Sequence, residues 1–458
     1  MSTLMTIRLP LLTSSRMFCA GLLAFVTLAA SAQVPQEITF QDAVRIALDQ
    51  NIQLRQSANQ LRLSEIDVRS ARAAYLPSFN LSTGGGTNFG LSFDTNVGEL
   101  RTTANSRFNM SARTSVTLFD GFQRQSNLRQ SRLSVTANDL TLDRQRQWVV
   151  FEVASQFLAY IQQSEQIEVQ QENLAAQQQQ LAQIEEFVRV GTRPVSDLYQ
   201  QQAAVESAEL AILTTERQAQ NVMYQLIQTL QLDPLGSYEL VVPELQDEYL
   251  VPEEYDLGDL ITRARQQRSD LRAQEIFVLA ARQGLRAASG SMLPQLGFSA
   301  GAGTSYNSGI KAVDFGGQLE RNRSESISLS VSVPVFNGLR TRTQKQRAQV
   351  SYENARLAVE NTQQQVGNEV RAAYHDYLIA EKELEVSERQ LVYRQQALDA
   401  ARERYNVGAV TLVELTQAQS EWVQASQDAI TARYTIFVRK RLISYFTGEL
   451  DPNQPLFD

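Results

Sequence analysis

The feature that most constrains this chain is an internal repeat with a constant offset of 217 residues (336 − 119 = 217 for Phe119 and Phe336). Many landmarks coincide at this offset without a gap. The matched pairs include Leu54 and Leu271, Leu76 and Leu293, Gly121 and Gly338, Tyr160 and Tyr377, Gly191 and Gly408, and Asp197 and Glu414. Scattered chance matches would not keep one offset over most of a chain. The sequence therefore predicts two copies of one structural unit.

The first repeat is expected over residues 33–232, and the second, with the C-terminal tail, over 259–458. Residues 233–258 link them and contain Pro234, Pro243 and Pro252. Each repeat begins with a helical pattern, at about 39–73 and 256–289. A Leu-Pro pair ends each of these patterns, because the residue before proline disfavours the helical conformation.

Alternating apolar and polar residues follow, and they predict strand hairpins at 78–119 and 295–336. Polar loops are expected at 94–105 and 309–323. Two interpretations fit these strands: a soluble sheet with one face on a core, or a transmembrane barrel with lipid outside and water inside. Since four strands cannot close a barrel, the second interpretation requires several chains to contribute hairpins to one barrel.

A proline-free helical pattern of about 67 residues follows each hairpin, at 122–190 and 339–407, or roughly 100 Å at ~1.5 Å per residue. Apolar residues recur every seven positions, which is the coiled-coil period. Each long helix is expected to end at a glycine, Gly191 or Gly408, and a return helix follows at 195–231 or 412–447. A long soluble coiled coil is the alternative interpretation of this pattern.

Composition excludes several classes of function. Residues 1–32 resemble a secretory signal peptide, with a basic start, an apolar stretch and Ala30-Ser31-Ala32 before the cut. Removing them leaves no cysteine, a single histidine (His375), and a formal charge of −10 instead of −8, because Arg8 and Arg16 leave with the peptide. We therefore expect no metal site, no cofactor and no nucleic-acid partner. The sequence contains no nucleophile elbow and no phosphate loop, so no motif indicates an enzyme. After residue 32, no apolar run approaches the ~18 residues that a membrane helix needs.

The duplicated order of hairpin, strand-to-helix glycine, long helix, Val-Gly turn and return helix closely resembles TolC-like outer-membrane efflux proteins. The resemblance covers essentially the whole chain after residue 32. Its most specific segments are Val190-Gly191-Thr192-Arg193-Pro194-Val195-Ser196-Asp197-Leu198, the counterpart Tyr405-Asn406-Val407-Gly408-Ala409-Val410-Thr411-Leu412-Val413-Glu414-Leu415, and Val333-Pro334-Val335-Phe336-Asn337-Gly338.

The resemblance implies a mixed α+β membrane protein that forms a homotrimer. Three chains with four strands each would give a 12-strand outer-membrane β-barrel, continued by a long periplasmic α-helical coiled-coil barrel. The implied function is a passive exit duct of a tripartite efflux or type I secretion system. Its partners would be outer-membrane lipid, a periplasmic membrane-fusion adaptor and an inner-membrane pump of RND, ABC or MFS type. A periplasmic coiled-coil adaptor or scaffold is the alternative.

The resemblance also places a gate and an adaptor-docking site at the helix tips, at Gly191, Thr192, Arg193, Asp197, Tyr405, Gly408 and Glu414. Strand-to-helix transitions are expected at Gly121, Pro334 and Gly338. Copies of Asp197 and Glu414 would form carboxylate rings that favour cations, with Arg193 as a cation that holds the closed state. Alternatively, both acids are solvated residues that complement a helix dipole. The chain departs from the family pattern because Gly-Thr-Arg lies in the first tip, and Val410 takes the place of the second-tip arginine.

Overall fold

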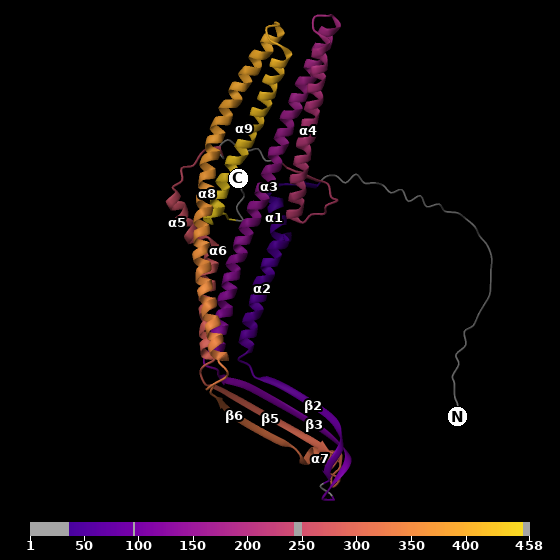
Figure 1. Ribbon diagram of the computed structural model, residues 1–458, viewed down its shortest axis with the longest axis vertical. Helices are drawn as coiled ribbons and strands as arrows, with labels where there is room; N and C mark the ends of the chain where they lie inside the picture. Colours follow the sequence, from indigo (N-terminus) through magenta and orange to yellow (C-terminus); the bar gives the residue numbers. More distant parts are fainter. Residues whose placement is uncertain (1–35, 95–96, 242–249, 452–458) are drawn as a thin grey trace, which may run out of the picture.

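A computed structural model describes residues 36–94, 97–241 and 250–451. The expected signal peptide, part of the expected linker and the last seven residues lie outside the described residues. The molecule is elongated: a curved sheet forms one end, and two helical hairpins reach the other (Figure 1). No helix in the described ranges is both long and apolar enough to cross a membrane.

The sheet has four antiparallel strands in the order β2 (Ser78–Asp94), β3 (Glu99–Phe119), β5 (Gln295–Asn307) and β6 (Ser324–Ser332). The pairing of β3 with β5 joins the two repeats. Alternation sorts the side chains by face: Leu81 lies opposite Ala112, whereas the Ser82 and Ser111 hydroxyls are hydrogen-bonded at 2.8 Å. Strands β2 and β6 each have one free edge within the chain.

Both predicted hairpin loops were wrong in extent. Pairing of β2 with β3 continues to Asp94 and Glu99, so most of the predicted loop at 94–105 is strand. The loop at 309–323 contains a short helix, α7 (Phe315–Arg321), whose Phe315 ring packs against Phe108 and Tyr306. Polar residues in these segments hid the strand and helix continuation, because a two-faced strand is itself half polar.

The second hairpin ends at Ser332, four residues earlier than the predicted end at 336. Pro334 follows, and proline has no N–H to donate to a strand ladder. The matching stretch of β3 continues to Phe119 because β5 pairs with it there, whereas β6 has only one neighbour. Pro334 therefore lies in the connection between the sheet and the next helix.

Two helices of 67 residues each form the long axis of the molecule: α3 (Gln123–Arg189) and α8 (Arg340–Asn406). Their return helices are α4 (Val195–Leu230) and α9 (Leu412–Thr447). The seven-residue seam of α8 is buried at most positions, including Val370, Tyr377, Leu384, Leu398 and Tyr405. The spacing of seven thus marks the face that packs against the neighbouring helices.

The first helical segment of each repeat is broken in two, which differs from the single helix predicted there. The pairs are α1 (Phe40–Gln50) with α2 (Ile52–Ala73), and α5 (Leu257–Gln267) with α6 (Ser269–Gly290). The breaks fall at Asn51 and Arg268, which have extended ψ angles of 124° and 119°. Asn51 caps α2 through its side chain, which accepts a hydrogen bond from the Leu54 N–H at 3.1 Å.

Near mid-length, α1 and α5 pack onto the long helices and form a belt. A small parallel sheet completes it, in which β1 (Gln36–Ile38) pairs with β4 (Tyr238–Leu240). The Phe40 ring of α1 contacts Phe157 of α3, and the Tyr255 ring before α5 contacts Tyr377 of α8. These aromatic contacts lie in the two larger apolar clusters of the molecule.

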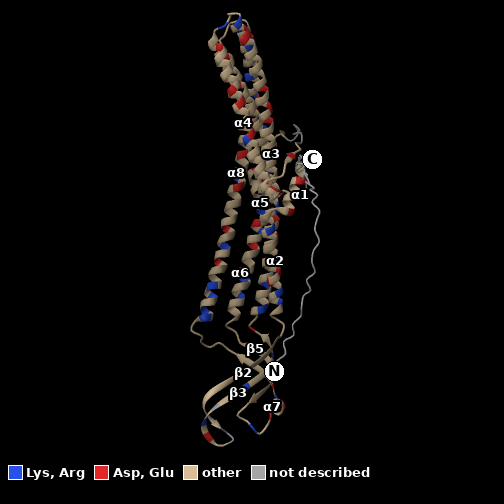
Figure 2. Ribbon diagram, turned by 90° about the vertical axis from the view of Figure 1, so that its right-hand side faces the viewer, with Lys and Arg blue, Asp and Glu red and all other residues tan. Residues whose placement is uncertain are grey.

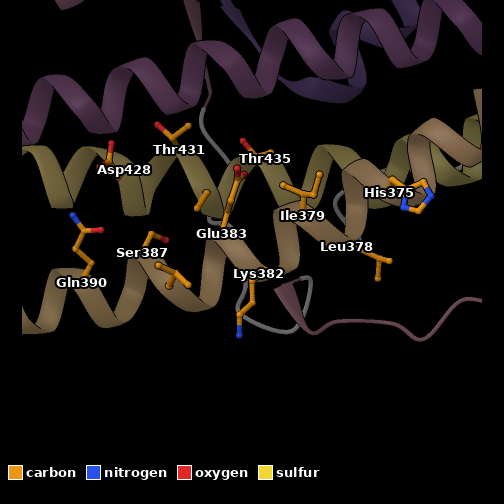
Figure 3. Close-up of a pocket in the computed structure, with 12 residues that line it drawn as sticks. His375, Leu378, Ile379, Lys382, Glu383, Ser387, Gln390, Asp428, Thr431 and Thr435 are labelled. Atoms are coloured by element: carbon orange, nitrogen blue, oxygen red, sulfur yellow. The ribbon is translucent and has the colours of Figure 1, made fainter.

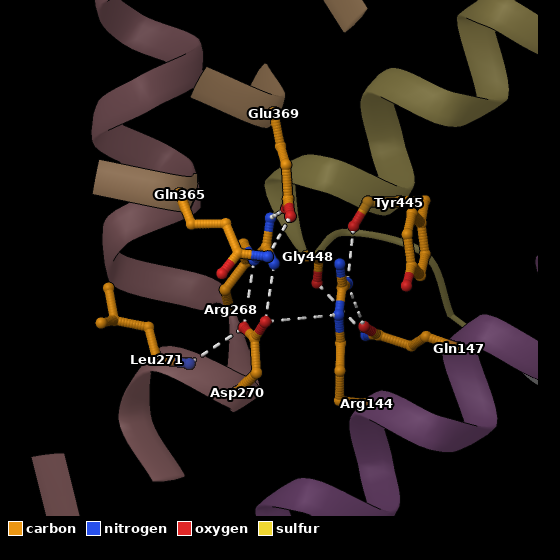
Figure 4. A network of polar contacts seen from close by, with 9 residues as sticks. All are labelled: Arg144, Gln147, Arg268, Asp270, Leu271, Gln365, Glu369, Tyr445 and Gly448. Carbon is orange, nitrogen blue, oxygen red and sulfur yellow. Dashed lines mark hydrogen bonds and ion pairs between the residues drawn. The ribbon is translucent and has the colours of Figure 1, made fainter. Parts of the chain in front are cut away.

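A buried charge network lies beside this belt and joins the two repeats (Figure 4). Arg268 binds Asp270 at 2.6 Å and Glu369 of α8 at 2.6 Å. Arg144 of α3 lies 3.8 Å from the centre of the Tyr445 ring and donates to the Tyr445 carbonyl at 2.8 Å. Burial opposes ionisation of Asp270, but Arg268 outweighs it and lowers the pKa of that carboxyl.

Candidate functional site

The two helix tips have the same backbone turn. Gly191 and Gly408 both have φ +75°, a conformation that glycine adopts without strain. In the first tip the Thr192 N–H donates to the Phe187 carbonyl at 2.9 Å, and in the second the Ala409 N–H donates to the Arg404 carbonyl at 2.7 Å. This pattern is a Schellman motif, which satisfies the carbonyls at a helix end. The turns predicted from the sequence therefore lie at the end of the molecule that is far from the sheet.

The side chains of the two tips meet through an apolar cluster. Ile184 of α3 packs with Leu398 of α8 and with Leu412 and Leu415 of α9, and all four are buried. Val410, at the position that matches Arg193, is also buried in this cluster. The asymmetry in the sequence is therefore an asymmetry in packing, because the second tip turns an apolar side chain inwards where the first carries a cation.

Arg193 lies over the ring of Tyr405, with 4.6 Å between the guanidinium carbon and the ring centre. Within the described residues it forms no ion pair with Asp197 or Glu414. Tyr405 is 2% exposed, and burial raises the pKa of its hydroxyl even though Arg193 acts in the opposite direction. The structure thus brings Arg193 and Tyr405 together as a cation–π pair that links the two hairpins.

The two tip acids occupy the first turns of their helices. The Glu414 N–H donates to the Thr411 hydroxyl at 3.3 Å, so Thr411 is the N-cap of α9 and Glu414 is the third residue of that helix. Asp197 is half-buried in the first turn of α4, and its N–H donates to the Pro194 carbonyl at 3.1 Å. Both positions complement the positive end of a helix dipole.

The predicted strand-to-helix transitions have a shared backbone conformation. Gly121 and Phe122 are both left-handed, with φ +66° and +67°, and Gly338 and Leu339 repeat this with φ +65° for each. The contacts differ between the two: a Cβ on Gly121 would lie 2.3 Å from the Gly290 carbonyl oxygen, whereas one on Gly338 would meet nothing within 4 Å.

A buried polar tie near the first tip was not apparent from the sequence. Gln201 of α4 is fully buried and donates to the Gln177 side chain at 2.7 Å and to the Gln177 carbonyl at 2.9 Å. In the other hairpin the matching position of α8 is Arg394, which pairs with Glu421 of α9. Glutamine is frequent on the exposed faces of these helices, so composition gave no means of identifying the buried ones.

The described residues contain no group of three or more histidine, cysteine, aspartate or glutamate side chains arranged to hold a metal ion. The tips are instead held by apolar packing, helix caps and the contact of Arg193 with Tyr405.

The chain matches the family model described as outer membrane efflux protein over residues 43–230 and 260–439. The two matched segments begin 217 residues apart (260 − 43 = 217), which is the offset of the internal repeat.

Curated relatives are distant in sequence but similar in length. The outer membrane efflux protein BepC of Brucella suis is 24% identical over 445 residues, covering 95% of this chain and 90% of that protein. The protein CyaE of Bordetella pertussis is 25% identical over 416 residues, covering 90% of this chain and 85% of its own length.

Solved structures have the same fold. The Campylobacter jejuni CmeC outer membrane channel superposes with a TM-score of 0.76 at 16% identity, covering 91% of this chain and 87% of that one. The outer membrane protein VceC of Vibrio cholerae also gives a TM-score of 0.76 at 16% identity, covering 89% and 96%.

Proposed function

The chain belongs to the outer membrane efflux protein family, and on that premise we propose that three copies assemble into one exit duct. The duct sits in the outer membrane, and its long helical part lies in the periplasm. It conducts substrates passively from a periplasmic adaptor and an inner-membrane pump of RND, ABC or MFS type to the exterior. The tips that carry Arg193 and Tyr405 form the gate and the adaptor-docking site.

The observation that carries the trimer is the repeat itself, because each contact between the repeats has an unfilled counterpart at the chain's outer edges. In the sheet, Thr114 of β3 lies opposite Ala300 of β5. At the 217-residue offset, the counterpart of Thr114 is Val331 of β6 and the counterpart of Ala300 is Thr83 of β2. The repeat therefore predicts that Val331 of one copy lies opposite Thr83 of a second copy. Both of these strands have a free edge. Three chains of four strands exceed the minimum of ~8 that a barrel needs.

The helices give the same result. In the half of the molecule near the sheet, α3 packs against both α2 and α6, whereas among the described helices its counterpart α8 packs there against α6. The uncovered surfaces are apolar: Val350 and Leu357 on α8, and Leu63 on α2, are each more than half exposed. Ala280, the counterpart of Leu63 on α6, is buried. A second copy's α2 therefore fits against α8 and removes this apolar surface from water.

A groove between α8 and α9 is the third unfilled counterpart (Figure 3). Its α8 side exposes Leu378, Ile379 and Val386. In the first repeat the matching surface of α3 is covered by α9, so the groove is expected to receive α4 of a second copy. The side of α4 that faces away from its own chain supplies apolar side chains for it, since Leu210 and Leu213 are 64% and 61% exposed.

The contacts between α3 and α9 predict residue pairs for this groove. Gln166 of α3 donates to the Thr431 hydroxyl at 3.1 Å. The counterpart positions are Glu383 on α8 and Thr214 on α4 of the next copy. Similarly, Gln419 donates to Asn173 at 3.2 Å, which predicts that Gln202 of one copy lies against Gln390 of the next.

Cysteine cross-linking tests this arrangement cleanly, because the chain has no cysteine after Cys19. The double variant Thr214→Cys/Glu383→Cys is expected to form disulfides between chains. Oxidised outer-membrane fractions should then run as a covalent ladder that ends at three chains on a non-reducing denaturing gel.

The matched control uses the same geometry within one chain. Gln166→Cys/Thr431→Cys should form an internal disulfide and leave the mobility of a single chain. Efficient linkage in this control, with no linkage between chains in Thr214→Cys/Glu383→Cys, would contradict the proposed assembly.

A further inference from the structure

Basic residues gather where the helices approach the sheet, in short segments that contain no acidic residue. Four segments form this region, which we call the basic collar: residues 69–73, 123–132, 282–290 and 340–347. No aspartate or glutamate occurs in any of them. Their cations are Arg69, Arg72, Arg124, Arg129, Arg132, Arg282, Arg286, Arg340, Arg342, Lys345 and Arg347. Figure 2 shows the basic residues at this end of the helices and the acidic residues mostly towards the tips.

Most of these charges are not neutralised by the chain. Arg124 pairs with Asp120 at 3.0 Å. Arg129, Arg132, Arg340, Arg342 and Lys345 have no described carboxylate within ion-pair distance. Arg340 and Arg342 also lie in the first turn of α8, where the helix dipole disfavours a cation. Neither a partner nor the local backbone accounts for their placement.

The belt indicates which face of the long helices lies on the outside of the proposed duct. A stripe along α3 with the seven-residue period includes Gln125, Arg129 and Arg132, all exposed, and it continues to Phe157, which α1 covers. An element as large as α1, repeated around a duct, would fill its lumen, so the face that it covers is the outer one. Arg342 is the counterpart of Gln125 and therefore lies on the outer stripe of α8.

Exposed apolar side chains lie directly next to the collar, on the side of the sheet. Val335 is 92% exposed and Phe336 is 82% exposed, and both lie in the short connection between β6 and α8. Leu76 and Phe122 have the same placement at two other transitions, at 68% and 60% exposed. Apolar side chains followed within one or two helical turns by cations are typical of a chain leaving the hydrocarbon of a membrane through its headgroup layer.

From this arrangement we infer that the basic collar binds the phosphate groups of anionic phospholipids in the periplasmic leaflet of the membrane that holds the barrel. The cations lie within roughly 15 Å of the helix ends, at ~1.5 Å per residue, so they reach the headgroup layer. The inference rests on the proposed barrel. It adds that the protein selects the lipids around it by charge.

Arg340, Arg342 and Lys345 are the cations to test. Arg347 is left out because its counterpart Gln130 lies against Gly284 of α6, and the repeat therefore places Arg347 next to Asp67 of a second copy. The variant Arg340→Gln/Arg342→Gln/Lys345→Gln is compared with a control on the same helix, Arg371→Gln/Arg389→Gln/Arg404→Gln, whose three side chains are exposed farther from the sheet.

Each protein is reconstituted into vesicles of phosphatidylcholine with or without phosphatidylglycerol, and the lipids retained by the extracted protein are counted by native mass spectrometry. The unmodified protein and the control should retain phosphatidylglycerol preferentially. The collar variant should lose about fivefold in this preference for each removed charge. Raising the ionic strength should reduce the preference in the unmodified protein.

An unchanged phosphatidylglycerol preference in the collar variant would overturn the inference. If the ratio of anion to cation permeability changed at the same time, these cations would belong to the lumen instead. Channel activity in pure phosphatidylcholine separates this test from the proposed function, because a collar variant that conducts normally there shows an intact duct.

Discussion

At the scale of single residues, the contact between Arg193 and Tyr405 is the most specific feature of the tips. It joins the first tip to the second hairpin, and its two partners are 212 positions apart in sequence (405 − 193 = 212). A guanidinium over a tyrosine ring contributes about 1–2 kcal/mol when it is partly shielded from water. An interaction of that size can bias a gate without locking it.

Arg193→Ala is therefore expected to raise the resting conductance of the channel in planar bilayers. Losing about 1–2 kcal/mol from the closed state should increase the open population roughly 5- to 30-fold. Arg189→Ala, which removes a more exposed arginine that pairs with Glu186, serves as the control and should leave conductance unchanged. Tyr405→Phe keeps the ring and should also have little effect. Equal conductance in Arg193→Ala and the unmodified channel would exclude a latch at this contact.

Asp270 belongs to the same scale, because its carboxylate is one of the two that pair with the buried Arg268. Asp270→Asn is expected to cost about 3 kcal/mol at neutral pH, since it leaves the Arg268 guanidinium with fewer charged partners. The folded-state pKa of Asp270 is lowered, so its stabilising effect is present above the unfolded-state value of about 3.9 and is lost as the pH falls below it.

The measurement is the thermal dissociation of the detergent-extracted protein over a pH series. The difference in dissociation temperature between Asp270→Asn and the unmodified protein should be constant above about pH 4 and should disappear at lower pH. The exposed pair of Asp143 and Arg146 supplies the control, because Asp143→Asn should change stability little at any of these pH values. A gap between Asp270→Asn and the unmodified protein that persists in acid would argue against the charged role.

At the scale of elements, the two transitions between strand and helix have the same backbone conformation but different packing contacts. Gly121 meets the backbone of Gly290 at the end of α6. The counterpart contact, between copies, would pair Gly338 with Ala73 of α2. Alanine carries a Cβ where Gly290 has none, so the two backbones cannot approach as closely there. The transitions between copies are expected to be the more open ones.

Alanine substitutions at the two glycines should therefore differ in effect. Gly338→Ala should cost about 1–2 kcal/mol, the strain of a left-handed alanine. Gly121→Ala should cost more, because the atom in its way is a backbone carbonyl that cannot move aside. The midpoint of thermal dissociation of the extracted protein measures both. A Gly338→Ala variant as unstable as Gly121→Ala would mean that the two transitions are equally close-packed.

Sequence periodicity predicted the long elements closely and the short ones poorly. The observed α3, Gln123–Arg189, lies within one residue of the predicted 122–190 at both ends, because an unbroken heptad pattern and a terminal glycine determine such a helix. The breaks at Asn51 and Arg268 were not predicted, since arginine is ordinary in helices and a lone asparagine does not by itself mark a break. Both residues have partners far along the chain: Asn51 donates to the Thr229 carbonyl at 3.1 Å, and Arg268 pairs with Glu369 at 2.6 Å.

Sequence rules likewise predicted some features of the candidate site and not others. The glycine turns at the tips followed from local sequence rules, and so did the inequality of Arg193 and Val410. The pairing of Arg193 with Tyr405 did not, because it depends on how two hairpins lie side by side. Likewise, the bond from Arg144 to Tyr445 joins residues 301 positions apart. The outer boundaries of the two repeats remain a prediction, since they lie outside the described residues.

At the scale of the whole molecule, the proposed trimer makes the chain one third of a closed object, and the offset between its two repeats predicts how the copies meet. The offset that pairs α9 with α3 inside the chain also specifies the partners of α4 and α8 between chains. Charge is also distributed unevenly along the long axis, with cations at the sheet end of the helices and acids mostly towards the tips (Figure 2).

The open sheet imposes an order of events on the cell. Among the described strands of the single chain, β2 and β6 each have a free edge, and β2 has three consecutive glycines, Gly84 to Gly86, that leave its register weakly specified. Unpaired edges of this kind readily recruit the wrong strands. The time that a newly exported chain spends alone is therefore the hazardous interval. In the proposed trimer this interval shortens as export becomes faster, because three chains must meet before any one of them is protected.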